Sequence, residues 1–139
     1  MTYDEALQKF GLPASPIQRD EIRRLLAEEI EQARRGESGE EMLRTLCLQL
    51  FSLGVVEDTL LIWDAKHSSF DAGCGIDVQL LCGAGLEATK EFLAESRNGS
   101  AAAALGYLTK CERTGDFAGW TPQTSIADSR RYYGLEQIK

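Results

Sequence analysis

The sequence has a single histidine and four cysteines, and these residues never form closely spaced pairs. His67 stands alone, and Cys74 and Cys82 are eight residues apart. Structural zinc sites draw their ligands from close pairs of cysteine or histidine. The sequence therefore predicts no metal site, and no motif for a cofactor stands out.

Long apolar runs are also missing. A membrane-spanning helix needs roughly 20 consecutive apolar residues, and no segment comes near this length. The N-terminus lacks the basic and apolar regions of a secretory signal. We therefore expect a soluble, cytoplasmic protein that keeps its cysteines reduced and does not contact a membrane.

Strand-like alternation and a phosphate-binding loop are absent as well. Gly73, Gly75, Gly83 and Gly85 form a glycine cluster. A P-loop needs a preceding strand and a lysine, and this cluster has neither. We interpret these glycines as helix caps and tight turns.

Acidic residues outnumber basic ones by 22 to 15, which gives the 139-residue chain a net charge of −7. This charge disfavours nonspecific attraction to nucleic acid, and it favours a basic partner. Hydrophobic residues make up 43% and charged residues 27%, as in ordinary globular proteins. A domain of this size buries roughly two thirds of the surface of its unfolded chain. We expect one domain over residues 1–139.

Apolar residues recur at helical spacing over residues 40–96, and glycines or polar caps interrupt them. In one helix they cover nearly the whole circumference: Met42, Leu43, Leu46, Cys47, Leu48, Leu50, Phe51 and Leu53. This pattern predicts a helix that is buried on several sides and lies at the centre of the fold.

The same reasoning divides the chain into helices and turns. Two N-terminal helices are expected within residues 1–36, stacked helix pairs over 40–133, and a polar tail over 134–139. The expected helices span residues 3–10, 16–35, 40–53, 56–67, 74–82, 86–95, 101–113 and 122–133, with a loop over 68–75. The fold class is all-α.

The helix pairs repeat at a spacing of about 30 residues. The segment LFSLGVVEDTLLIWDAK, a helix, a glycine turn and a second helix, resembles HEAT-like repeats, and the resemblance covers about 100 residues of the chain. It implies antiparallel helix hairpins stacked as a short solenoid, with an irregular helical bundle as the alternative. The tetratricopeptide and ankyrin signatures are absent.

Small acidic helical proteins of this kind resemble bacterial immunity proteins. The segments FDAGCGIDVQLLCGAGLEATKEFL and RRYYGL are similar to bacterial proteins of comparable length, some of them associated with toxin loci. The resemblance implies a non-enzymatic inhibitor that covers a basic toxin domain and captures it by electrostatic steering. The resemblance assigns no functional residue. A regulatory scaffold subunit is the alternative: it would bind a protein by the same interactions and differ only in its partner.

Polar residues stand among small ones in the segment FDAGCGIDVQLLCGAG. One hypothesis is that Asp71, Asp77 and Gln79 line a concave binding groove; the other is that Asp71 caps a helix and Asp77 and Gln79 face water. Acidic residues of this groove and of the hinge form the predicted protein-binding site: Glu40, Glu57, Asp58, Asp64, Asp71 and Asp77.

A thiol-dependent hydrolase is the second functional hypothesis. Cys74 would be the nucleophile, His67 its base, and Asp71 or Asp77 the residue that orients the base. Such enzymes usually draw these groups from distant parts of the chain. We therefore expect Cys74 to be a packing residue and the chain not to be an enzyme.

Aromatic residues gather near the C-terminus: Phe117, Trp120, Tyr132 and Tyr133. Such residues can anchor a partner, or they can fasten a terminal helix to its own domain. We expect the second role. The identity of the partner, the face that it meets and the oligomeric state do not follow from the sequence.

Overall fold

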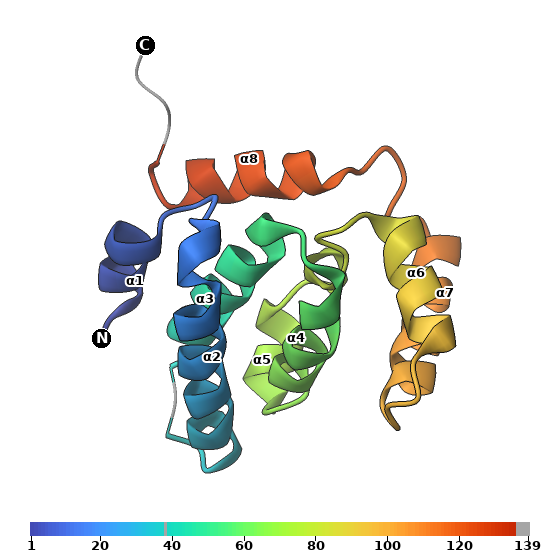
Figure 1. Cartoon of the computed structure of the whole chain (residues 1–139), viewed down its shortest axis with the longest axis horizontal. Helices are drawn as coiled ribbons and strands as arrows, with labels where there is room; N and C mark the ends of the chain where they lie inside the picture. Colours follow the sequence, from blue (N-terminus) through green and yellow to red (C-terminus); the bar gives the residue numbers. More distant parts are fainter. Residues whose placement is uncertain (38, 136–139) are drawn as a thin grey trace.

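The computed structural model describes residues 1–37 and 39–135, and the side chain of Glu40 lies outside that description, as does most of the predicted tail over 134–139. The described part is all-α and contains no strand (Figure 1). Its α-helices are α1 (Tyr3–Phe10), α2 (Arg19–Arg34), α3 (Glu40–Leu53), α4 (Thr59–Lys66), α5 (Phe70–Gly75), α6 (Leu86–Glu95), α7 (Ala101–Arg113) and α8 (Pro122–Tyr132). Three 3₁₀ turns join them: η1 (Pro16–Gln18), η2 (Val56–Asp58) and η3 (Val78–Leu81).

Helix α3 is the centre of the fold, as its apolar circumference predicts. It packs against α1, α2, α4, α5, η3 and α8. Even two of its polar residues, Thr45 and Gln49, are buried. The Gln49 side-chain amide donates hydrogen bonds to the carbonyls of Ala6, at 2.9 Å, and Gly11, at 3.0 Å, and so ties α1 to α3.

The contacts of α3 do not confirm a stack of hairpins. In a solenoid each repeat contacts only its neighbours along the chain. Helix α3 instead contacts α1 and α8, which come from opposite ends of the sequence. Helices α6 and α7 pack against each other at one side of the molecule (Figure 1). The arrangement has the contacts of an irregular bundle.

Helix α8 lies across the ends of the other helices (Figure 1). The hydroxyl of Tyr133 lies 2.8 Å from that of Thr45 on α3. The ring of Trp120 packs 6.3 Å from that of Phe51 and 5.3 Å from that of Phe117, between centroids. Three of the C-terminal aromatics therefore fasten α8 to the domain, as expected, whereas Tyr132 is 63% exposed.

The segment from residue 68 to 82 differs from its prediction of a loop followed by a helix. Residues 70–75 form α5, and the chain is extended at Asp77 before it enters η3. The Ser69 hydroxyl accepts a hydrogen bond from the backbone N–H of Ala72 at 3.0 Å, which caps the start of α5. At its other end, the amine of Lys66 donates to the carbonyls of Gly73, at 2.7 Å, and Ile76. A helix too short and glycine-rich to form alone is thus held by neighbouring side chains.

Candidate functional site

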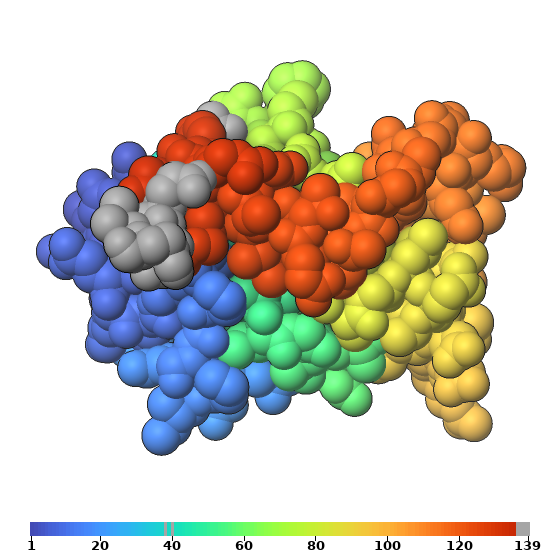
Figure 2. All heavy atoms as spheres, turned by 90° about the horizontal axis from the view of Figure 1, so that it is seen from above, coloured from blue at the N-terminus to red at the C-terminus, as the bar shows by residue number. Residues whose placement is uncertain are grey.

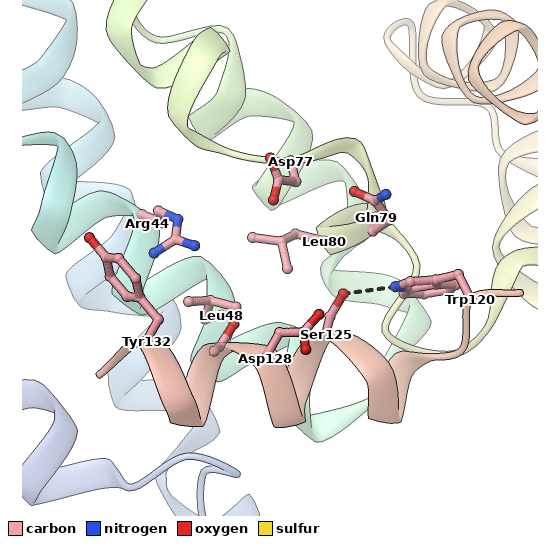
Figure 3. A pocket seen from close by; sticks show the side chains of 10 residues that line it. Arg44, Leu48, Asp77, Gln79, Leu80, Trp120, Ser125, Asp128 and Tyr132 are labelled. Carbon is pink, nitrogen blue, oxygen red and sulfur yellow. Dashed lines mark hydrogen bonds between the residues drawn. The ribbon is translucent and has the colours of Figure 1, made fainter. Parts of the chain in front are cut away.

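A pocket of 320 Å³ lies between α3, η3 and α8. This volume falls in the range of ligand-binding pockets, roughly 300–1,000 Å³. In Figure 3, Arg44 and Tyr132 stand at one end and Trp120 at the other, and Asp77 faces Asp128 across the pocket. Its remaining lining residues are Leu48, Gln79, Leu80, Ser125 and Ser129.

Three elements supply the walls. Arg44 and Leu48 are one turn apart on α3, so their side chains share a face. The chain that leads into η3 brings Asp77, and η3 itself brings Gln79 and Leu80. On α8 the lining residues Ser125, Asp128, Ser129 and Tyr132 follow the spacing of one helical face.

Two further hollows adjoin the pocket and share lining residues with it. One, of 440 Å³, is lined by Glu41, Gly75 and also by Arg44 and Tyr132. The other, of 400 Å³, shares Asp77 and Gln79 with the pocket, and its further lining residues include Lys66, Cys74, Tyr107 and Asp116. Because neighbouring hollows share lining residues, we treat the three together as the α8 groove. Figure 2 shows the surface hollowed between the green α5 region and the orange α7, beside α8.

Charges of both signs line the α8 groove, with an excess of acid. Its carboxylates belong to Glu41, Asp77, Asp116 and Asp128, and its cations to Arg44 and Lys66. Asp77 and Asp116 are exposed. Within residues 1–37 and 39–135, the carboxylate of Asp77 forms no ion pair, and that of Asp128 pairs only with exposed Arg131 on the same helix.

Arg44 is held in place by aromatic rings. Its guanidinium carbon lies 4.9 Å from the ring centroid of Tyr132 and 6.0 Å from that of Tyr133, as in a cation–π contact. One guanidinium N–H donates to the hydroxyl of Tyr133 at 3.3 Å. Burial raises the pKa of Tyr133, against the opposing effect of its hydrogen bond with Thr45. Tyr133 is therefore a neutral support for Arg44.

Lys66 has a structural role in the groove wall. Its side chain is buried, and its amine donates hydrogen bonds to the backbone carbonyls at the end of α5. Burial lowers the pKa of Lys66, and the negative charge of Asp77 acts in the opposite direction. The side-chain amide of Gln79 donates to the carbonyl of Asp116 at 2.8 Å. These bonds hold the loop that carries Asp77 against α4 and against the turn that follows α7.

A larger hollow, of 480 Å³, lies along the surface of α2. All its lining residues come from that one helix and its C-terminal cap Arg35, and Arg24 and Glu28 among them form an ion pair at 2.8 Å. A hollow with a single wall cannot enclose a ligand. We therefore place the candidate site in the α8 groove, which has walls from several elements.

The structure does not bring together the five predicted site residues whose side chains it describes. Asp77 alone lines the groove among the five whose side chains are described; Asp71 is exposed in the first turn of α5, and Glu57 is exposed on η2. Asp64 pairs with Arg34. The sixth residue, Glu40, has its side chain outside the described part of the structure.

Asp58 corrects the expectation that its carboxylate faces a partner. Its side chain is 1% exposed and is bound by Arg19, at 2.8 and 2.9 Å, and by Arg23. The two arginines lie one turn apart on α2. The carboxylate is therefore already paired within the chain, and these ion pairs join α2 to the start of α4.

The groups of the proposed thiol hydrolase are not arranged as a catalytic dyad. The Nδ1 of His67 lies 2.9 Å from the carbonyl of Trp63, and its ring packs 4.0 Å from the Trp63 ring. No hydrogen bond joins His67 to Cys74 among the described residues. Cys74 is exposed, which corrects the expectation that it packs in the interior. The absence of enzymatic activity stays a prediction.

The four thiols should differ sharply in reactivity. Cys47, Cys82 and Cys111 are buried, and burial raises the pKa of the Cys82 thiol to about 12. Because the thiolate is the reactive form, we expect Ellman's reagent at pH 8 to label one thiol rapidly in the native chain and four after denaturation. Cys74→Ser should abolish the rapid phase, and a second rapid thiol would contradict the burial of the other three.

A metal site and a membrane-spanning helix are the two alternatives to a groove. No group of three or more His, Cys, Asp and Glu side chains among the described residues is placed to hold a metal ion. None of the described helices combines the length and the apolar character needed to cross a membrane. The α8 groove thus remains the candidate site.

The likeness to HEAT-like repeats and to immunity proteins stays a prediction from the sequence. The structure bears out the all-α class, which many unrelated functions share. The fold class alone therefore indicates no function. No family model matches the chain, and no curated protein and no solved structure gives a significant match to it.

Proposed function

We propose that this chain is a non-enzymatic protein-binding module whose α8 groove receives a basic segment of a partner protein. The observation that carries the proposal is the exposed acidic wall of the groove. Asp77 and Asp116 face solvent there, and Asp128 is 62% exposed on the opposite side. Among the described residues, Asp77 and Asp116 form no ion pair, and Asp128 can exchange its exposed partner Arg131 for a lysine or arginine from outside.

The form of the groove favours a polypeptide as its ligand. The three hollows adjoin one another through shared lining residues, so together they offer a polypeptide segment more contact surface than one pocket does. Leu48 and Leu80 give the central pocket apolar surface, and Trp120 and Tyr132 give it aromatic surface. Protein interfaces are enriched in aromatic residues, which combine a large contact area with a polar tip.

The charge of the whole chain supports a basic partner. A net charge of −7 raises the rate of encounter with a basic surface and repels nucleic acid and anionic lipid. We propose that the chain is an inhibitor that covers a basic toxin domain, as an immunity protein does. Such a protein needs neither a cofactor nor a metal.

A pull-down with charge-matched variants tests the proposal. The groove variant Asp77→Asn/Asp128→Asn and the control Glu28→Gln/Glu31→Gln on α2 each change the net charge from −7 to −5. From a native lysate in 50 mM salt, we expect the natural chain and the control to retain the same basic partner. The groove variant should bind it about tenfold more weakly, a loss of about 1.4 kcal/mol.

The same partner should be released from the natural chain at high salt, because screening weakens pairs of exposed charges. Equal retention by all three proteins would contradict a role of the groove. Loss of the partner from both variants alike would show that only the overall charge matters.

A further inference from the structure

We propose that Arg44 determines specificity in the groove by pairing with an Asp or Glu side chain of the partner segment, while Asp77 and Asp128 pair with lysines or arginines that flank it. This inference rests on the proposed function, and it narrows the partner from any basic segment to one with an acidic residue inside it. Of the two cations that line the groove, Arg44 is the one that would select the acidic residue, because the amine of Lys66 already donates to backbone carbonyls.

Within the part of the chain that the structure describes, the guanidinium of Arg44 has donors left for a ligand. It carries five N–H groups in a planar fork, and one of them donates to the neutral hydroxyl of Tyr133. Among the side chains that the structure describes, no carboxylate lies within ion-pair distance of it, although Asp77 and Asp128 line the same pocket. Figure 3 shows the guanidinium of Arg44 beside Tyr132 at one end of the pocket, with Asp77 and Asp128 on its two sides. Opposite charges that face a shared space without touching leave room for ligand groups of both signs.

Arg44 is also fixed before a ligand arrives. The rings of Tyr132 and Tyr133 hold its guanidinium, and Tyr133 is anchored in turn to Thr45. A side chain already ordered in the free protein loses little further entropy on binding. A planar guanidinium held in this way suits two-pronged recognition of a carboxylate.

The position of Arg44 along the groove identifies the source of that carboxylate. Arg44 lines both the 320 Å³ pocket and the 440 Å³ hollow beside it, so it stands where two hollows meet and not at an end. A segment that lies along the groove passes Arg44 and continues. Such a segment presents a side chain there, whereas a terminal carboxylate would leave one hollow empty.

An array of random 12-residue peptides, synthesised in parallel with free and with amidated C-termini, tests the inference on the intact chain. We expect the best binders to carry several lysines or arginines and one internal Asp or Glu, and to bind equally well in both forms. Changing that internal Glu to Gln in a selected peptide should weaken its binding to the natural chain about tenfold, the typical worth of a charge-assisted pair.

The outcomes separate the two proposals. Basic binders without any preference for an acidic residue would overturn the role of Arg44 and leave the proposed function standing. Peptides that bind only with a free C-terminus would contradict the inference that the carboxylate bound by Arg44 belongs to an Asp or Glu side chain. A lack of basic binders would overturn both proposals.

Variants of Arg44 assign the effect to this residue. In Arg44→Gln the Glu and Gln forms of the peptide should bind alike, because the group that distinguishes them is gone. Arg44→Lys keeps the charge without the planar fork, so we expect a preference of about threefold, equivalent to about 0.6 kcal/mol. If Arg44→Gln fails to fold, the comparison of the two peptides on the natural chain and on Arg44→Lys still decides the question. An unchanged tenfold preference in Arg44→Lys and Arg44→Gln would overturn the inference.

Discussion

We expect Gly83→Ala to lower the free energy of unfolding by about 3 kcal/mol, at the upper end of the usual cost of overpacking. A Cβ atom at residue 83 would lie 2.4 Å from the carbonyl oxygen of Phe51 and 3.2 Å from its carbonyl carbon. Neither side can move easily, because Phe51 is buried and its carbonyl accepts the N–H of Gly54, which caps α3. Urea unfolding followed by circular dichroism measures the change.

Gly106→Ala is the matched control. Gly106 lies inside α7, and a Cβ there would meet no atom within 4 Å. Alanine is the better helix former by roughly 0.8–1.0 kcal/mol, so this variant should be more stable than the natural chain by about that amount. If Gly83→Ala were as stable as the natural chain, α3 and the loop after η3 could not approach each other as closely as described.

The substitution of Gly83 would also affect the groove. Its loop follows η3, which carries Gln79 and Leu80 in the groove wall. A shift of this loop away from the end of α3 would displace η3 as well. The position of the groove wall therefore depends on the close backbone contact between Gly83 and Phe51, and neither of these residues lines the groove.

The main helices could be predicted because their signals are local. Apolar residues at helical spacing mark α2 and α3, and the αL glycine that ends α3, Gly54, follows its last residue directly. Helix α5 could not be predicted in this way. Its sequence FDAGCG contains two glycines, and its stability depends on Lys66 from the preceding helix.

The candidate site was only partly predictable. Asp77 and Gln79 are polar residues among small ones, and the sequence left open whether they line a groove or face water; both line the pocket, and Asp77 is also exposed. The face of α8 that carries Ser125 and Asp128 could also have been found from its helical spacing. Arg44 gives no such signal, because its role depends on aromatic residues 88 and 89 positions further along the chain.

Asp58 shows why acidic residues of the sequence cannot be sorted into surface and interior without the fold. Its partners Arg19 and Arg23 precede it by 39 and 35 residues. From the sequence, Asp58 and its neighbour Glu57 look alike. Only the packing of α2 against the start of α4 buries one carboxylate and exposes the other.

We expect Asp58→Ala to lower the free energy of unfolding by about 3 kcal/mol, the lower end of the cost of breaking a buried ion pair. The change leaves two guanidinium groups beside an emptied buried position. Their side chains are 30% and 38% exposed, so each arginine can recover part of its hydration, and this keeps the loss from being larger. Urea unfolding of the variant beside the natural chain measures the difference.

Two controls separate the burial of Asp58 from its charge. Arg23→Ala should cost only about 1 kcal/mol, because Arg19 still holds both carboxylate oxygens of Asp58. Asp64→Ala removes a carboxylate of the same sign from a half-exposed pair with Arg34, and pairs of this kind contribute about 0–1 kcal/mol. A loss at Asp58 no greater than that at Asp64 would mean that water reaches the Asp58 carboxylate, and Asp58 would then again be available to a partner. A loss several times greater would place Asp58 in the framework that positions α2 and α4, and would leave recognition to the acidic wall of the groove.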